Sequence, residues 1–113
     1  YALSASQLSH IPTAFICSRD SSAYQLLKIL KEKNIRVPED VSITGFDDYI
    51  LSSLCTPKIT TYSIDVAKLT DSCIWLLLDR IAQPDRPLRH IVISGKIMER
   101  DSVRTLSTNP ESR

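Results

Sequence analysis

Three short apolar runs, each containing β-branched residues, lie along the chain between polar stretches. They are "AFIC" at 14–17, "VSITG" at 41–45 and "KITTYSI" at 58–64. Such runs are typical of strands in the interior of a sheet. The second run ends at Gly45, where we expect the strand to stop at a tight turn. The pattern therefore predicts three strands.

Two amphipathic stretches follow these runs and predict helices. Within 21–33, four apolar residues recur at i, i+3, i+4 and i+7 and form one stripe: Ala23, Leu26, Leu27 and Leu30. Asn34 tolerates the left-handed conformation that closes a helix. A second helix is expected from about Val66 to Ala82, with Asp65 as its amino-terminal cap.

The alternation of strands and helices favours an α/β fold with a parallel sheet flanked by helices. A parallel crossover needs a helix to carry the chain back to the start of the next strand. Near the end of the chain, "LRHIVIS" and "KIMER" flank Gly95 and predict two short strands or one bent strand. Residues 104–113 are expected to form a polar tail.

Composition and charge narrow the class of protein. The 113 residues fit one small domain or part of one, and because the chain starts at Tyr1 without an initiator Met, we expect a piece of a longer protein. The net charge of +1 excludes a surface that attracts nucleic acid or anionic lipid. The longest apolar run, 74–78, is far shorter than the roughly 18 residues that suggest a membrane span. Three cysteines without CxxC spacing suit a reducing compartment and are expected to be buried thiols.

Polar residues follow two of the expected strands, where ligands bind in open α/β sheets. They are Arg19, Asp20, Asp47 and Asp48. A carboxylate there can accept hydrogen bonds from vicinal hydroxyls or a ring NH, as in a sugar or nucleobase site. The alternative is helix capping, which applies most to Asp20 and Asp48, whereas Asp47 is nearer the strand end and is the better ligand candidate. Arg19 could instead pair with Asp47 and close the site.

Enzymatic chemistry has little support in the sequence. There is no P-loop, GxGxxG, GxSxG or HExxH pattern, so we expect no cofactor and no catalytic residues. His10 and His90 have no Cys or His neighbour at ligand spacing, and we expect no metal. Trp75, in a helix of leucines, is expected in a core or an interface rather than as a stacking platform.

Four stretches, read in order and at their spacings, carry a family resemblance. They are "PTAFICSRD", "RVPEDVSITGFDDY", "TPKITTYSID" and "IMERDSV". They resemble the carboxyl-terminal part of the effector-binding domain of LacI/GalR-type transcriptional repressors over about residues 11–103. The resemblance implies a two-lobed fold like that of the periplasmic sugar-binding proteins, an effector cleft between the lobes, and a helix-turn-helix DNA-binding domain absent from this chain. Residues 12–63 and 88–103 would lie in the carboxyl-terminal lobe, and 65–84 would be a helix of the amino-terminal lobe.

The resemblance also implies roles for individual residues. Asp47, the first aspartate of "GFDD", matches the family's effector ligand. Arg19 stands where the family frequently has Asn, which favours an anionic effector such as a sugar phosphate or carboxylate, or else a cleft blocked by pairing with Asp47. Six residues match the family's homodimer interface: Tyr24, Leu27, Lys28, Leu51, Leu54 and Cys55. Plain core packing is the alternative for Leu27 and Leu54.

The leading hypothesis is the ligand-sensing and dimerisation segment of a cytoplasmic, non-enzymatic transcription regulator. It would bind a sugar, a sugar derivative or a nucleobase between two lobes and reach operator DNA through the absent domain. A second hypothesis is an exported solute-binding protein of a sugar transporter. A third, a flavodoxin-like α/β enzyme, needs a nucleophile or cofactor loop that the sequence does not contain.

Overall fold

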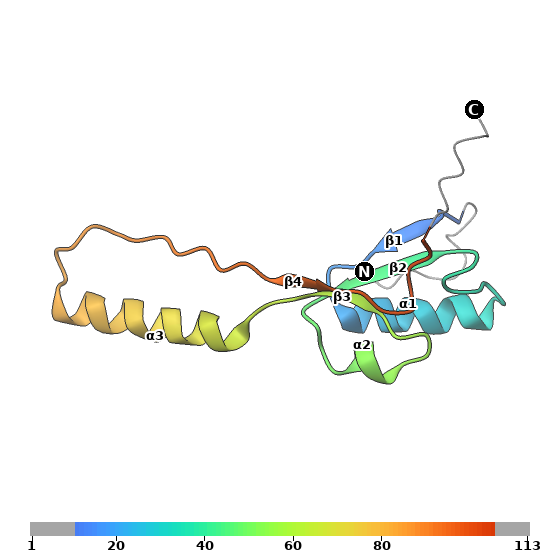
Figure 1. The fold of residues 1–113 in the computed structure, drawn as a ribbon, viewed down its shortest axis with the longest axis horizontal. Coiled ribbons are helices and arrows are strands. Elements are labelled where there is room, and N and C mark those ends of the chain that lie inside the picture. The colour runs from blue at the N-terminus through green and yellow to red at the C-terminus, as the bar shows by residue number, and fades with distance from the viewer. Residues whose placement is uncertain (1–10, 106–113) are drawn as a thin grey trace, which may run out of the picture.

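The computed structural model describes residues 11–105. Its elements, in chain order, are β1 (Ala14–Ile16), α1 (Asp20–Glu32), β2 (Ser42–Phe46), α2 (Leu51–Leu54), β3 (Thr60–Ser63), α3 (Val66–Ala82) and β4 (Lys96–Met98). The strands form one sheet in the order β1-β2-β3-β4 (Figure 1). β1, β2 and β3 are parallel, as predicted, and β4 runs antiparallel to β3 at the edge of the sheet.

The predicted helices lie close to their expected places. α1 buries the predicted stripe, because Ala23, Leu26, Leu27 and Leu30 are all at most 6% exposed. Asn34 adopts a φ of 57° and ends this helix, as expected. α3 has the predicted bounds, and the Asp65 carboxylate accepts a hydrogen bond of 3.0 Å from the Lys68 amide.

Two parts of the secondary structure differ from the prediction. Residues 88–94, expected to form a strand, belong to no strand, because strand pairing needs a neighbouring backbone and no described segment pairs with them. The single-turn helix α2 was not predicted. Its four residues are too short to produce a helical repeat of apolar positions.

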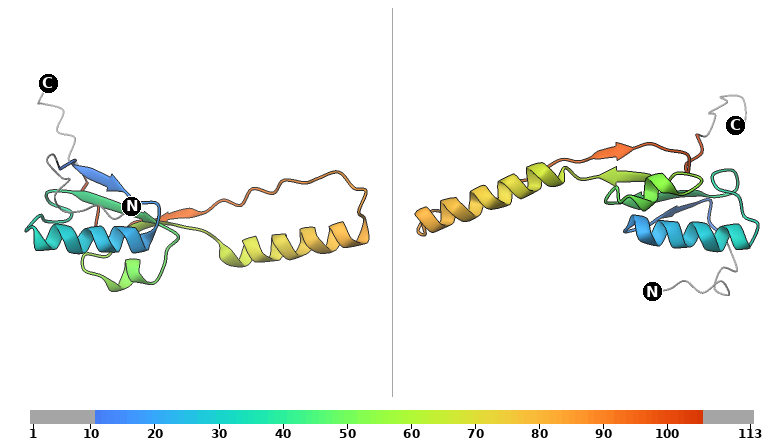
Figure 2. Two further views of the ribbon diagram at one scale, coloured as in Figure 1. Left: turned by 180° about the vertical axis from the view of Figure 1, so that it is seen from behind. Right: turned by 90° about the horizontal axis from the view of Figure 1, so that it is seen from below.

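The hydrophobic core lies between α1 and the sheet. α1 and α2 cover the same face of the strands (Figures 1 and 2). The α1 stripe meets Val41, Ile43 and Ile59, each at most 2% exposed, and Phe15 packs against this cluster from β1. We call this unit, residues 11–63 and 96–105, the sheet lobe.

Ser102 closes the sheet lobe at the amino-terminal ends of β2 and β3. Its hydroxyl donates to the Ile43 carbonyl (2.6 Å) and accepts from the Thr60 amide (2.8 Å), and its carbonyl accepts from the Ile43 amide (2.9 Å). This fully buried side chain therefore joins the two strands where their own ladder ends.

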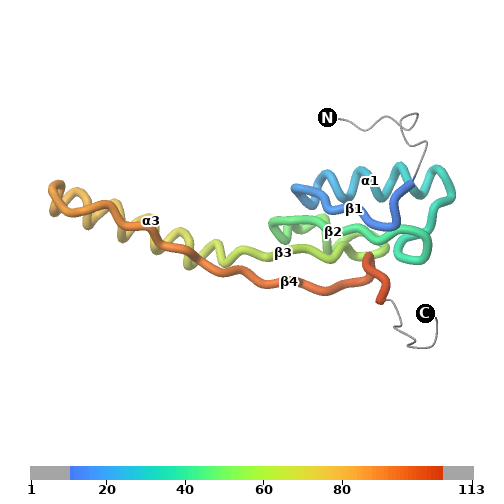
Figure 3. Tube along the Cα trace, turned by 90° about the horizontal axis from the view of Figure 1, so that it is seen from above, coloured from blue at the N-terminus to red at the C-terminus, as the bar shows by residue number. Residues whose placement is uncertain are grey.

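α3 and residues 87–95 project from the sheet lobe as an arm (Figures 2 and 3). α3 contains no buried residue, and its exposed side chains include Trp75, Leu77, Leu78 and Ile81. The radius of gyration is 19.5 Å, against roughly 13 Å for a compact domain of this length. The arm therefore carries an apolar surface that nothing in the described chain covers.

Candidate functional site

A sharp turn follows β2 at the carboxyl edge of the sheet. Asp47 and Asp48 adopt positive φ angles of 95° and 53°, which non-glycine residues take only when their surroundings hold them. The turn was expected at Gly45, but Gly45 lies inside β2 and its φ is not positive. We call residues 47–49 the aspartate turn.

Gly45 serves instead to make room for Asp20. A Cβ atom at Gly45 would lie 2.0 Å from the Asp20 carboxylate oxygen Oδ1. Asp20 is 1% exposed, and its carboxylate accepts from the Tyr49 amide and the Thr61 hydroxyl, each at 2.6 Å. The expected capping role is wrong for Asp20: Arg19 occupies the N-cap position of α1 without a side-chain capping bond. Asp20 therefore ties the start of α1 to the aspartate turn and to β3.

Asp48 is held by Arg100, which follows β4. The guanidinium donates to Asp48 Oδ1 at 2.5 Å, and both side chains are mostly shielded from solvent. Partial burial raises the pKa of the Asp48 carboxyl, but hydrogen bonds from Arg100 and Ser63 and nearby positive charges outweigh this effect and leave the pKa below its ordinary value. The capping interpretation fails here too, because the N-cap of α2 is Ile50 and has no side-chain bond.

Asp47 differs from its neighbours in the same turn. Its amide donates to the Tyr62 carbonyl (3.0 Å), which fixes the backbone, while its side chain is exposed and makes no hydrogen bond or ion pair with residues 11–105. Arg19, at the end of the adjacent strand β1, is also exposed and forms no ion pair within the same range. The pair between Arg19 and Asp47 that would close the site is therefore not formed.

A hollow of about 420 Å³ lies where the chain leaves the sheet lobe for the arm and returns from it. It is lined by Ser63, Ile64, Asp65, Val66, Ser94, Gly95 and Lys96. Tyr62 contacts one of these residues: its phenol accepts a hydrogen bond of 2.8 Å from the Gly95 amide, and its ring stacks on Phe46 at 5.4 Å between centroids. A side chain at Gly95 would collide with this ring, because its Cβ would lie 2.5 Å from it.

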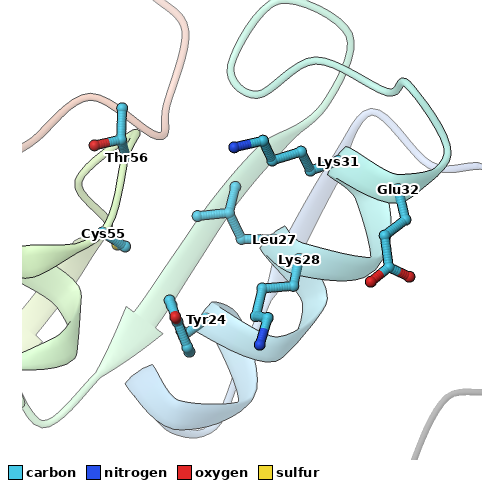
Figure 4. A pocket seen from close by; sticks show the side chains of 7 residues that line it. All are labelled: Tyr24, Leu27, Lys28, Lys31, Glu32, Cys55 and Thr56. Carbon is cyan, nitrogen blue, oxygen red and sulfur yellow. The ribbon is translucent and has the colours of Figure 1, made fainter.

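A second concave surface lies between α1 and the segment that follows α2. We call it the groove surface, and it has a volume of about 480 Å³ (Figure 4). Its residues are Tyr24, Leu27, Lys28, Lys31, Glu32, Cys55 and Thr56. The Lys28 ammonium lies 5.6 Å from the centre of the Tyr24 ring, within reach of a cation–π interaction.

The structure thus brings four of the six predicted interface residues together: Tyr24, Leu27, Lys28 and Cys55. Leu27 is a core residue, 6% exposed, and forms the floor of the groove surface. Leu54 is 71% exposed, so the core alternative is wrong for it. Leu51 is half-buried on α2 and does not line the groove.

The cysteines and Trp75 are less enclosed than expected. All three cysteines are free; Cys17 and Cys55 are half-buried and Cys73 is exposed on α3. Burial raises the pKa of the Cys17 and Cys55 thiols, which makes them poor nucleophiles at neutral pH. Trp75 is 48% exposed, with the Arg89 guanidinium 5.1 Å from its ring.

Residues 11–105 contain no group of three His, Cys, Asp or Glu side chains placed to hold a metal ion. Within the same residues, no helix has the length and apolar character needed to cross a membrane. His90 is exposed, and His10 lies outside the described residues.

Sequence reasoning gave no role to the polar residues that hold the aspartate turn. Thr61 and Arg100 are distant from the turn along the chain and meet it only in the folded sheet, whereas Ser52 follows the turn directly in α2. Thr61 and Arg100 belong to the stretches "TPKITTYSID" and "IMERDSV", which indicated a family but assigned no contacts, and Ser52 belongs to none of the four stretches.

Comparison with known proteins agrees with this architecture. Residues 1–103 match the family model described as "Periplasmic binding protein-like domain". The chain is 37% identical over 101 residues to a probable HTH-type transcriptional repressor ExuR of Bacillus subtilis, and 34% identical over 101 residues to the HTH-type transcriptional repressor PurR of Vibrio atlanticus; each alignment covers 89% of this chain and 30% of the relative. A LacI family transcriptional regulator from Enterococcus faecium, solved with bound ribose, superposes with a TM-score of 0.79 at 29% identity, covering 90% of this chain and 38% of that structure.

The chain therefore belongs to the family of periplasmic binding protein-like domains, in the form found in LacI-type transcription regulators. Both curated relatives are repressors rather than enzymes. The chain spans about a third of the length of these relatives or less.

Proposed function

We propose that this chain is the ligand-sensing and dimerisation segment of a cytoplasmic LacI-type regulator. A small effector would bind at the carboxyl edge of the sheet, between the sheet lobe and a second lobe that contains the arm. The observation that carries the proposal is the Asp47 carboxylate, exposed and unpartnered within the described chain, in a turn whose backbone is fixed from several sides. Effector binding would favour one lobe arrangement and so change the affinity for operator DNA.

The arm supports the two-lobed arrangement. α3 has no buried residue, and residues 88–94 extend beside it without a partner strand, as expected if another part of the regulator covers both. In this proposal α3 belongs to the amino-terminal lobe. In this proposal the returning segment belongs to the second lobe as far as Gly95 rather than residue 87, and the start of β4 at Lys96, where the chain pairs with β3 again, supports this boundary.

The test is the Asp47→Ala variant of the intact regulator, screened against D-ribose, D-glucuronate and D-ribose 5-phosphate. We expect at least one probe to bind the parent protein and release operator DNA, and the variant to lose at least tenfold in affinity. The matched control is Asp101→Ala, which removes an exposed carboxylate at the opposite end of the sheet lobe. Equal affinity of Asp47→Ala and the parent protein would contradict the proposal.

We further propose that the effector carries a negative charge. Arg19 supports this choice, because its exposed guanidinium forms no ion pair with residues 11–105 and lies at the end of the strand beside Asp47. A guanidinium presents paired donors that match a phosphate or carboxylate group. Arg19→Asn, the residue frequent in the family, is expected to weaken binding of D-ribose 5-phosphate at least tenfold and binding of D-ribose by less than threefold. If Arg19→Asn weakened the binding of both probes by the same factor, the result would argue for a neutral sugar.

The groove surface supports a homodimer. It combines an apolar floor with the opposite charges of Lys28, Lys31 and Glu32, so a two-fold axis can bring the Lys of one copy to the Glu of the other. Leu54 is exposed and directly precedes Cys55, which lines the groove surface. Leu54→Lys is expected to convert the dimer to monomer in sedimentation velocity. Ile16→Lys, at a 90% exposed position on the edge strand β1, is the control and should leave the dimer intact.

A further inference from the structure

Arg100, which follows β4, donates hydrogen bonds to three separate parts of the sheet lobe. Its side chain is 15% exposed and lies 52 residues along the chain from Asp48, to which Nη2 donates at 2.5 Å. Nη1 donates to the Ser52 hydroxyl at 2.7 Å and to the Ile59 carbonyl at 3.0 Å. One guanidinium therefore joins the aspartate turn, α2 and the segment that leads into β3.

Two separate routes lead from Arg100 to the aspartate turn. The first is the direct bond to the Asp48 carboxylate. The second passes through Ser52, whose fully buried hydroxyl accepts from Arg100 and donates to the Tyr49 carbonyl at 2.6 Å. Arg100 thus holds the Asp48 side chain directly and the Tyr49 backbone through Ser52. These are the two residues that follow Asp47.

The hydrogen bonds of Arg100 lie next to the strained backbone of the aspartate turn. Positive φ angles at two consecutive aspartates are costly for residues with a Cβ and persist only when neighbouring groups hold them. The amides of the turn bond to the Tyr62 carbonyl, the Thr61 hydroxyl and the Asp20 carboxylate. Within residues 11–105, Arg100 is the cation that forms an ion pair with a side chain of this turn.

The geometry points to Arg100 as a positioning residue for the effector site. By holding Asp48 and Tyr49, it sets the direction in which the neighbouring Asp47 carboxylate projects, without itself touching the ligand. This inference rests on the proposed role of Asp47 as the effector ligand. Lysine cannot replace Arg100 fully, because one ammonium cannot match the fixed fork that reaches Asp48, Ser52 and the Ile59 carbonyl together.

The first measurement needs no ligand. Hydrogen exchange of the amides of residues 47–49 is followed in the intact protein and in the variants Arg100→Lys and Asp48→Asn, with the amides of α1 as internal reference. Exchange at the turn is expected to rise at least tenfold in both variants while α1 stays unchanged. Unchanged exchange at the turn would overturn the inference whatever the effector is.

The second measurement is a double-mutant cycle for binding of D-ribose and D-ribose 5-phosphate, with affinities measured on the folded fraction. Arg100→Lys is expected to weaken binding about tenfold in the parent protein and less than twofold in the Asp47→Ala background, because Arg100 acts through Asp47. A merely structural role would lower the folded fraction and leave the affinity unchanged, and equal losses in both backgrounds would likewise overturn the inference. A failure of the proposed function can be told apart from a failure of this inference. If the proposed function were wrong, Asp47→Ala alone would leave the affinity for the probes unchanged.

Discussion

At the scale of single residues, Asp20 and Gly45 depend on each other. Asp20 is charged yet almost fully buried, a costly arrangement unless its oxygens are hydrogen-bonded. Oδ2 accepts a hydrogen bond from the Tyr49 amide and Oδ1 accepts one from the Thr61 hydroxyl. The missing side chain of Gly45 leaves the space that Oδ1 occupies. The glycine is needed for close approach between two elements and not for its own backbone conformation.

Substitution of Gly45 should therefore destabilise the fold. A methyl group there meets the Asp20 carboxylate at 2.0 Å, so one of the two must move and the buried hydrogen bonds must distort. We expect Gly45→Ala to lower the free energy of unfolding by about 2 kcal/mol, measured by urea denaturation. Thr44→Ala, at the half-buried preceding position, is the control and should cost less than half as much. If Gly45→Ala and Thr44→Ala lowered the free energy of unfolding equally, the Asp20 carboxylate would have moved aside without loss of stability.

The pair of Asp48 and Arg100 predicts a pH dependence. Because the folded-state pKa of Asp48 is lowered, its ionised form stabilises the fold above the unfolded-state pKa of about 3.9, and this contribution is lost as the pH falls through the lower folded-state value. Asp48→Asn should accordingly cost most at pH 7 and progressively less below about pH 4. Urea denaturation of both proteins from pH 7 to pH 3 measures the difference, and a constant difference across this range would contradict the prediction.

At the scale of elements, local signals were sufficient for α1, α3 and the three parallel strands. A stripe such as Ala23, Leu26 and Leu27, a cap such as Asp65 and a β-branched run such as "VSITG" each act within a few residues. The capping roles expected for Asp20 and Asp48 were wrong for a different reason. Asp20 and Asp48 resemble helix caps in sequence, but their carboxylates accept hydrogen bonds from Thr61 on β3 and from Arg100 after β4 instead. The spacing of apolar residues does not predict contacts between segments that are distant along the chain.

The cap of α3 gives a prediction at this scale. The Asp65 carboxylate satisfies the Lys68 amide in a helix that has no buried residue of its own within the described chain. Asp65→Ala should cost about 1 kcal/mol and increase hydrogen exchange in the first turn of α3. Exchange in α1 serves as the internal control. A first turn of α3 that exchanges as slowly as before would show that other contacts hold it.

At the scale of the whole molecule, the arm leaves its apolar residues exposed. Leu77 and Ile81, at 60% and 66% exposure, lie on α3 one turn apart. In the 113-residue chain with Leu54→Lys, which removes the proposed dimer contact, we expect concentration-dependent association through the arm. Adding Leu77→Gln and Ile81→Gln should abolish this association in sedimentation velocity. In the intact regulator the same two changes should lower stability instead, because the arm is then covered.

The two chain connections to the arm lie side by side, at residues 64–66 and 94–96. A rotation at this joint would move the whole of α3 relative to the sheet lobe. A 17-residue helix is about 25 Å long, so a rotation of about 10° at the joint carries its far end about 4 Å while the aspartate turn stays in place. A spectroscopic distance from the tip of α3 to the sheet lobe would therefore report a small rotation at the joint as a displacement of several ångströms.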